Sequence, residues 1–373
     1  MIPYGRQSIS AEDIAAVTRV LGSEFLTTGP EIGIFEKALE GWTDGTPAVA
    51  VSSGTAALHV AFKAIGIKPG DEVITPPLTF IATQATAALH GAHIVFADVQ
   101  EDTGNIDPSL IERLITKNTK AIVAVDYAGH PADLDELKNI CTQHSLILVE
   151  DAAHSLGSEY KGKKVGSIAD ITTFSFFPTK NIATGEGGAV VSNNPKFLAA
   201  ARLFARQGLI RDKEKQKYPN EGPWHQEVHD FSLNYRMPDI LAALGTSQIA
   251  RLEKFKLNRQ LIFKKYSEGL AQIKNITLPT RKSYVDPVWH LFPIRVDASK
   301  RRAIFEELQE VGIKVQVNYI PAHWHPVFKN TPARGSLPIS EKFYSTEISL
   351  PMSSDLSDSE ISFVIENVKK IVG

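Results

Sequence analysis

Cysteine is nearly missing from this sequence, since Cys141 is the only one in 373 residues. A lone cysteine excludes an intrachain disulfide and a cysteine metal cluster, and it is typical of a protein kept in a reducing cytoplasm. Excess charge of one sign is also missing, because 40 basic and 42 acidic residues leave a formal net charge of -2. No basic run is long enough to indicate a nucleic acid partner.

Long apolar runs are absent as well. The N-terminal residues Met1-Ile2-Pro3-Tyr4 contain no apolar core of a signal peptide, and no run approaches the roughly 20 residues of a membrane helix. We therefore expect a cytoplasmic location and no membrane partner. The composition is that of a globular protein, and the length suffices for one large domain with a smaller one or for two equal domains.

Two periodicities alternate along the first half of the chain. Short β-branched runs predict strands at residues 48–51, 72–75, 93–97, 121–125, 146–150, 171–176 and 189–192. Between several of them the pattern predicts helices at 55–65, 80–90 and 133–144. Strands that alternate with helices indicate βαβ units, and continuous apolar strands indicate a sheet buried on both faces. We predict an α/β fold with a mostly parallel central sheet.

The pattern changes after a long helical tract at 238–270. Strands are predicted at 290–296 and 314–319, and helices at 300–311 and 357–372. This order indicates a smaller α+β domain at the C-terminus. We expect a large domain over residues 1–250, with an N-terminal arm, and a linking helix with the small domain over residues 251–373.

The turn Ser53-Gly54-Thr55 joins the first predicted strand to its helix. Backbone N–H groups at such a helix start can bind an anion, Gly54 permits close approach, and the hydroxyls add donors. An ordinary N-cap by Ser53 or Thr55 is the alternative. The segment has neither the P-loop ending nor the glycine spacing of a dinucleotide-binding turn.

An aromatic residue and an acid follow two other strands. Phe80 comes just after the predicted strand 72–75, where ligands of open α/β sheets bind, and it can stack on a planar ring. The alternative is a core phenylalanine. Asp151 ends the strand 146–150, and a carboxylate there can keep a pyridine nitrogen protonated. Its alternative is a helix N-cap.

Lys180 completes the set about thirty residues after Asp151. A buried lysine loses its proton readily and can then form a Schiff base with an aldehyde. Ser175 precedes it and can add a phosphate hydroxyl, while a glycine-rich turn at 183–188 can hold the lysine loop under the sheet. A phosphate turn, a stacking aromatic, a ring acid, a lysine and a glycine turn, in this order, predict an enzyme that uses pyridoxal 5'-phosphate.

The chain resembles the DegT/DnrJ/EryC1/StrS sugar aminotransferases, which have the type I pyridoxal-phosphate aminotransferase fold. The resemblance extends from Ile2 to the C-terminal region. Its strongest pieces are the runs at 52–58, 150–155, 174–180, 185–188 and 234–237. Weaker matches at 126–129, at 156–160 with 164–166, and at 348–351 resemble the pseudaminic acid branch of this family.

The resemblance implies a role for each matching residue. Lys180 carries the Schiff base and moves protons, and Asp151 pairs with the pyridine nitrogen. The other implied cofactor contacts are Ser53, Gly54, Thr55, Phe80, His154 and Ser175, and Asn234 from the partner subunit of a homodimer with a shared active site. The implied nucleotide-sugar contacts are Tyr4, Thr27, Asn318, Tyr319, Ile320 and Pro321. A core position is the alternative for His154 and Tyr319, and a polar loop residue for Asn234.

The resemblance also implies the reaction. L-glutamate is the expected amino donor, and a UDP-linked 4-keto-6-deoxy-N-acetylhexosamine is the acceptor, giving UDP-4-amino-4,6-dideoxy-N-acetyl-beta-L-altrosamine. Family members that dehydrate carry histidine at the lysine position, so Lys180 favours amino transfer. A bacillosamine-type UDP sugar or a dTDP-linked 4-keto sugar stays open as the substrate, as does a non-enzymatic sensor. His323 and His325 have the spacing of ligands, but no third ligand is evident, so we expect no metal.

Overall fold

The computed structural model describes residues 1–329 and 337–373. A seven-stranded sheet forms its centre, in the order β1-β9-β8-β5-β4-β2-β3. Its strands are β1 (Ala48–Val51), β2 (Glu72–Thr75), β3 (His93–Phe96), β4 (Thr119–Val125), β5 (Ile147–Asp151), β8 (Ile171–Ser175) and β9 (Gly188–Val191). Only β9 runs antiparallel to its neighbours, β1 and β8. The predicted mostly parallel sheet is confirmed.

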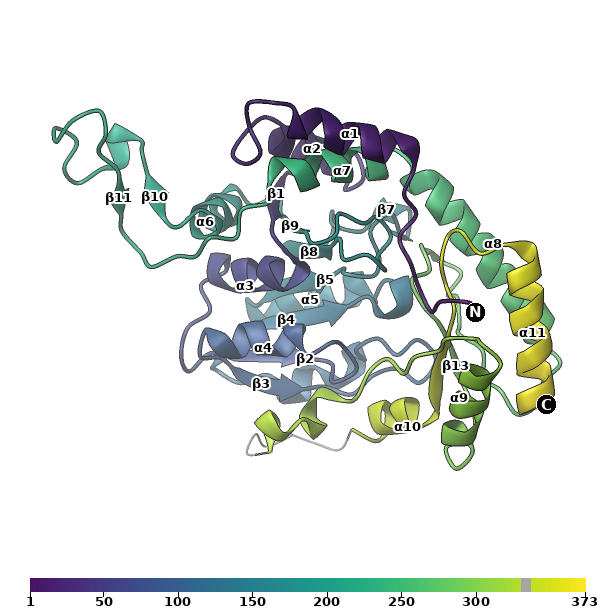
Figure 1. Cartoon of the computed structure of the whole chain (residues 1–373). Helices are drawn as coiled ribbons and strands as arrows, with labels where there is room; N and C mark the ends of the chain where they lie inside the picture. The colour runs from purple at the N-terminus through teal and green to yellow at the C-terminus, as the bar shows by residue number, and fades with distance from the viewer. Residues whose placement is uncertain (330–336) are drawn as a thin grey trace.

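Apolar side chains cover both faces of this sheet, as its continuous apolar strands require. On one face Val49 and Val123 join a cluster with residues of α3 (Gly54–Ala64), α4 (Ala82–Leu89) and α6 (Pro195–Ala205). On the other face Ala50 packs with α2 (Glu31–Glu40) and α7 (Asp239–Ile249), and Ile122 packs with α5 (Leu134–His144). Helix α1 (Ala11–Leu21) lies beside α7 (Figure 1).

The helical tract predicted over residues 238–270 is two helices in the structure. Helix α7 ends at Ile249, and α8 (Leu252–Leu270) begins after Ala250 and Arg251. The chain turns there, so that α7 stays against the sheet while α8 leads to the C-terminal elements (Figure 1). Tyr266 and Leu270 of α8 are fully buried in the C-terminal apolar cluster. The division into domains at residue 250 stays a prediction.

The C-terminal part is a two-stranded sheet of β13 (Phe292–Arg295) and β14 (Glu347–Leu350), flanked by α9 (Arg301–Glu310), α10 (Pro338–Thr346) and α11 (Asp358–Val372). The predicted strand 314–319 is wrong. Only Ile313 and Gln316 form isolated bridges there. Side chains, and not a neighbouring strand, form the hydrogen bonds to the backbone of Asn318. Glu347 Oε2 accepts the N–H of Asn318 at 2.7 Å, and the Tyr127 hydroxyl donates to the Asn318 carbonyl at 2.6 Å.

Small elements complete the fold. An arm with β10 (Leu209–Ile210) and β11 (Glu227–Val228) extends away from the body beside α6 (Figure 1). A three-stranded sheet joins β12 (Val285–Asp286), β6 (Glu159–Tyr160) and β7 (Lys163–Lys164). The 3-10 turns are Pro108–Leu110, Glu112–Leu114, Tyr127–Gly129, Lys213–Lys215, Ala322–Trp324 and Pro326–Phe328. Within residues 1–329 and 337–373, no helix has the length and apolarity needed to cross a bilayer.

Candidate active site

A cavity of about 530 Å³ opens at the carboxyl edge of the central sheet. This is the size of a site for a small molecule. Its floor consists of residues that follow β1, β2, β5 and β8, because parallel strands end at the same edge. A wall of the cavity comes from the N-terminal arm and the segment 316–319. The predicted residues that line it are Tyr4, Ser53, Gly54, Thr55, Phe80, Asp151, His154, Ser175, Lys180, Asn318 and Tyr319.

The turn after β1 is both a helix cap and an anion cradle. Ser53 Oγ accepts the N–H of Ala56 at 3.0 Å and so caps α3, as the alternative interpretation expects. Gly54 lies against Ser175, and a Cβ on Gly54 would approach Ser175 Cβ at 2.6 Å and Oγ at 2.7 Å. The backbone N–H groups at the start of α3 thus meet the hydroxyls of Thr55 and Ser175 in one corner of the cavity. This corner can bind a phosphate.

Asp151 is the last residue of β5 and is 6% exposed. Thr83, on the first turns of α4, donates to its Oδ2 at 2.7 Å, and the N–H of Ala153 donates to Oδ1 at 3.2 Å. No helix begins after Asp151, so the N-cap alternative is wrong. Burial raises the pKa of Asp151, while the bond from Thr83 and the charge of Lys180 lower it. A buried carboxylate fixed by two donors can pair with a cationic ring nitrogen.

Lys180 lies in the same cavity, on the loop between β8 and β9. Its backbone N–H donates to the carbonyl of Phe177 at 2.8 Å, so the loop is a tight turn. Burial lowers the pKa of Lys180 to about 8, and the charge of Asp151 opposes this shift. A substantial fraction of the amine is therefore neutral near physiological pH, as a Schiff-base nucleophile requires.

The glycine-rich turn after Lys180 packs under the phosphate corner. Phe176 exchanges backbone hydrogen bonds with this turn, donating to Gly187 and accepting from Thr184, each at 2.9 Å. A Cβ on Gly188 would come within 2.4 Å of the carbonyl oxygen of Ser53. Only glycine fits where β9 passes the turn after β1. The two bonds of Phe176 close the loop that contains Lys180, and Gly188 brings this loop against the turn after β1.

Four rings surround the remaining space above Asp151. Phe80 is 58% exposed and lines the cavity, so the core alternative is wrong. Its ring lies edge-on to Tyr319, with centroids 6.1 Å apart. Tyr319 hydrogen-bonds to His154 Nε2 at 3.1 Å, and His154 packs on His290 at 4.2 Å between ring centroids. Burial and the charge of Lys180 lower the pKa of His154, so its ring is neutral.

Four predicted residues lie outside this cavity. Thr27 is exposed in the loop after α1, and Asn234 is exposed at the base of the arm, where it bridges Arg206. Ile320 is 46% exposed, and Pro321 is buried, but neither lines the cavity. In one subunit these residues do not meet the cofactor corner.

Among the cavity residues that were not predicted, two contact predicted site residues directly. Thr83 holds Asp151, and His290 shields the far side of His154. Thr83 lies three residues after Phe80, one helical turn further along the same edge, and this spacing was a usable signal. His290 precedes β13 and comes from the C-terminal part, so no local pattern connects it with Asp151. Its Nδ1 and that of His154 are buried without a partner among the described residues.

The cavity fits pyridoxal phosphate. Gly54 lets the turn approach Ser175 closely, and the Nδ1 atoms of His154 and His290, two residues that line the cavity, are buried without a partner among the described residues. Asp151 and Lys180 provide the acid and the amine that the ring and the aldehyde of this cofactor need.

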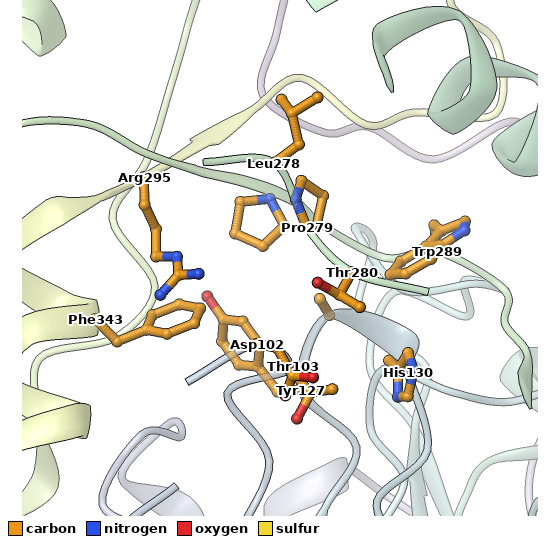
Figure 2. Close-up of a pocket in the computed structure, with 12 residues that line it drawn as sticks. Asp102, Thr103, Tyr127, His130, Leu278, Pro279, Thr280, Trp289, Arg295 and Phe343 are labelled. Carbon is orange, nitrogen blue, oxygen red and sulfur yellow. The ribbon is translucent and has the colours of Figure 1, made fainter. Parts of the chain in front are cut away.

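Other places in the structure offer less. A cavity of about 10 Å³ lies behind Tyr127, between Thr280, Trp289 and Arg295 (Figure 2), and has room for about one water molecule. His323 pairs with Glu341 at 3.0 Å. In the part of the chain that the structure describes, no three His, Cys, Asp or Glu side chains converge as a metal site.

Comparison with known proteins identifies the family. The model of the DegT/DnrJ/EryC1/StrS aminotransferase family matches residues 7–369. The spore coat polysaccharide biosynthesis protein SpsC of Bacillus subtilis (strain 168) is 37% identical, over 100% of this chain and 97% of its own. The UDP-4-amino-4,6-dideoxy-N-acetyl-beta-L-altrosamine transaminase of Campylobacter jejuni subsp. jejuni serotype O:23/36 (strain 81-176) is 36% identical, over 99% of each chain.

Solved structures agree. Helicobacter pylori PseC, an aminotransferase involved in the biosynthesis of pseudoaminic acid, superposes with a TM-score of 0.93 at 32% identity, over 100% of this chain and 99% of its own. The PLP-form of the putative sugar aminotransferase Spr1654 from Streptococcus pneumoniae gives 0.92 at 31% identity, over 100% and 98%. The chain therefore belongs to the DegT/DnrJ/EryC1/StrS family and is a pyridoxal-phosphate-dependent sugar aminotransferase.

Proposed function

We propose that this enzyme transfers the amino group of L-glutamate to C4 of a UDP-linked 4-keto-6-deoxy-N-acetylhexosamine, giving UDP-4-amino-4,6-dideoxy-N-acetyl-beta-L-altrosamine. The observation that carries the proposal is the cavity that Lys180 and Asp151 line together with Tyr4, Asn318 and Tyr319. Similarity over the whole chain to the Campylobacter transaminase and to PseC supports the choice of sugar.

The proposed roles follow from the geometry. Bound pyridoxal phosphate supplies an electron-accepting ring and an aldehyde that can carry an amino group. Ser53, Gly54, Thr55 and Ser175 would hold its phosphate, and Phe80 would lie on its ring. Asp151 Oδ1 and Oδ2, fixed by Ala153 and Thr83, would keep the ring nitrogen protonated. Lys180 Nζ, neutral in part because of burial, would take the proton from the donor carbon and return one to sugar C4.

The stereochemistry at C4 depends on which face of the sugar Lys180 reaches. Tyr4, Asn318 and Tyr319 line the cavity and would hold the sugar there. Close analogues of a sugar differ by one or two hydrogen bonds, so these hydroxyl and amide groups would determine the choice of substrate.

The proposed assembly is a homodimer with a shared active site. Asn234 lies outside its own cavity, at the base of an arm whose Trp224 and Phe231 are 79% and 94% exposed. Large exposed aromatic side chains on one segment are typical of an interface. Asn234 would reach the cofactor phosphate of the partner subunit, and Thr27 would contact substrate.

Mixing two inactive variants tests the shared site. If Asn234 serves the partner, a Lys180→Ala subunit paired with an Asn234→Ala subunit contains one intact site. Co-refolded mixtures should then regain about a quarter of wild-type activity, as random pairing of subunits predicts. Mixtures that stay as inactive as the separate variants would contradict a shared site.

A panel of keto sugars tests the substrate. Purified enzyme with L-glutamate should aminate the UDP-linked 4-keto sugar, and NMR of the product should show at C4 the configuration that the L-altro sugar requires. Amination of a bacillosamine-type UDP sugar or of a dTDP-linked sugar alone would overturn the pseudaminic acid substrate. SpsC and the Campylobacter transaminase have similar identity to this chain, so identity alone does not select the sugar. A colourless protein that borohydride does not label at Lys180 after incubation with pyridoxal phosphate would instead favour a non-enzymatic sensor.

A further inference from the structure

Glu347 is a carboxyl that is completely buried and has no role in the reaction described above. It is the first residue of β14, follows the end of α10, and has 0% exposure. Within the described parts of the chain it forms no salt bridge, although Arg301 lies near enough to lower its pKa. A buried acid without an ion-pair partner is costly, so its hydrogen bonds need an explanation.

Both carboxyl oxygens of Glu347 accept hydrogen bonds that hold the wall segment in place. Oε2 accepts the backbone N–H of Asn318 at 2.7 Å, and Oε1 accepts the hydroxyl of Ser349. Ser349 Oγ in turn accepts Asn318 Nδ2 at 3.1 Å, which also donates to the Tyr4 hydroxyl at 2.6 Å. Since residues 317–320 form no ladder with a neighbouring strand, these side-chain bonds replace the missing backbone bonds.

The position of Asn318 determines where the next side chain lies. Tyr319 extends from Asn318 into the cavity, where its hydroxyl bonds to His154 Nε2 at 3.1 Å and its ring meets Phe80. Tyr4 lies against the same wall through Asn318 Nδ2. We propose that Glu347, which touches neither cofactor nor substrate, is a positioning residue that fixes the Tyr4–Asn318–Tyr319 wall and thereby the affinity for the acceptor sugar. The identity of that sugar rests on the proposed function.

The surroundings of Glu347 favour its neutral form. Tyr4 from the N-terminal arm and Tyr127 from the turn after β4 face the network, and both have a raised pKa because they are buried near Glu347. Arg301 of α9 donates to the carbonyl of Tyr344, and Arg295 of β13 lies over the Phe343 ring (Figure 2), so both cations are engaged elsewhere. Burial raises the pKa of Glu347 from 4.5 to about 8. A neutral acid keeps an oxygen that accepts the Asn318 N–H, and glutamine has the same shape and keeps the same acceptor.

Steady-state kinetics with two variants test the wall. Glu347→Ala removes the acceptor of the Asn318 N–H, and the Michaelis constant for the keto sugar should rise about tenfold, since a lost buried hydrogen bond costs on the order of that factor. The turnover number and the rate of the half-reaction with L-glutamate should change less than about threefold. Glu347→Gln should retain wild-type constants near neutral pH. The matched control is Asp170→Asn, whose carboxyl accepts the backbone N–H of Leu148 at 2.9 Å at the far edge of the sheet.

Two outcomes would overturn the proposal. One is a folded Glu347→Ala protein whose Michaelis constant for the keto sugar is unchanged. The other is an equal loss of rate in the half-reaction with L-glutamate and in the half-reaction with the keto sugar. If Glu347→Ala does not fold, Ser349→Ala replaces it, with an expected increase of about threefold in the sugar constant for the loss of one neutral bond.

A measurement without substrate separates this inference from the proposed function. Between pH 4.5 and 8 the folded protein holds a proton on Glu347 that the unfolded chain has lost. The contribution of this acid to stability is therefore complete below pH 4.5 and is lost as pH rises to about 8. Glu347→Gln should remove about one proton from the pH dependence of unfolding in this window. An unchanged dependence would refute a neutral Glu347, whichever sugar the enzyme uses, and failure of every keto sugar with wild type would refute only the proposed function.

Discussion

The two sides of the cavity are built in different ways. The floor, with Ser53, Asp151, Ser175 and Lys180, comes from ends of neighbouring strands in one sheet, whose backbone ladder fixes their relative positions. The wall, with Tyr4 and residues 316–319, comes from two segments more than 300 residues apart in the sequence. Hydrogen bonds between side chains and isolated bridges hold it. Single substitutions on the floor should therefore leave the structure intact but lower the rate of the reaction. Substitutions on the wall should instead weaken the binding of substrate.

Loss of the amine is the largest change expected on the floor. Lys180→Ala should lower the turnover number by at least about a thousandfold, because no other described residue of the cavity supplies a lysine to move protons. Borohydride should no longer fix the cofactor to the protein, as mass spectrometry of a tryptic digest would show. The exposed Lys163→Ala serves as control and should behave as wild type. A Lys180→Ala enzyme with a tenth of normal activity would contradict the proposed role of Lys180 in proton transfer.

Removal of the acid's charge should rank second. Asp151→Asn keeps the shape and the bond from Thr83 but cannot hold a proton on the ring nitrogen. We expect the turnover number to fall by about a hundredfold to a thousandfold, the range for a lost electrostatic contact at the reacting group. The melting temperature should stay the same or rise, because burial already opposes the charged form of Asp151. A large drop in melting temperature would mean that Asp151 is structural.

The pH dependence of cofactor capture should come third. In the proposed mechanism only the neutral amine of Lys180 would attack the aldehyde, and its pKa is about 8. The rate at which apoenzyme takes up pyridoxal phosphate should therefore fall about tenfold per pH unit below that value and level off above it. Stopped-flow absorbance at several pH values would measure it. A plateau that extends down to pH 6 would mean that the lysine is neutral at still lower pH.

The sequence predicted the floor well for a physical reason. Each of its parts follows an apolar run in the sequence, and the ends of parallel strands meet, so order along the chain implies proximity in space. Strand ends were correct within about two residues. The close packing at Gly188 could also be predicted, because a glycine between two apolar strands indicates that another backbone segment approaches closely.

The wall was harder to predict. Residues 314–319 have the alternating pattern of a strand, but Glu347 and Tyr127 take the backbone groups of Asn318 and prevent a ladder. Both partners are distant in sequence, and neither lies in a recognisable motif. His290 likewise reaches the cavity through a contact distant in sequence, because its backbone N–H donates to the carbonyl of Ala128 at 2.8 Å. The break between α7 and α8 was missed since Ala250 and Arg251 are good helix formers, and tertiary packing overrides them.

Steric filling of the phosphate corner should have an intermediate effect. Gly54→Ala places a Cβ 2.6 Å from Ser175 Cβ, which forces the turn or Ser175 to move. Overpacking of this kind costs about 1–3 kcal/mol, so the dissociation constant of pyridoxal phosphate should rise by about fivefold to a hundredfold. The control is Gly33→Ala on α2, where no atom lies within 4 Å and the helix should gain stability. Equal cofactor affinity in the two variants would show that the phosphate lies elsewhere.

The smallest effect should come from one hydroxyl on the wall. Tyr319→Phe keeps the ring against Phe80 but removes the bond to His154 Nε2. A neutral hydrogen bond contributes about 0.5–1.5 kcal/mol, so the Michaelis constant for the keto sugar should rise by about twofold to tenfold. Cofactor affinity, measured by titration of apoenzyme, should stay within a factor of about two, because the floor is intact. If cofactor affinity falls as much as sugar affinity, Tyr319 acts through His154 on the ring, and the floor and the wall are not separate units.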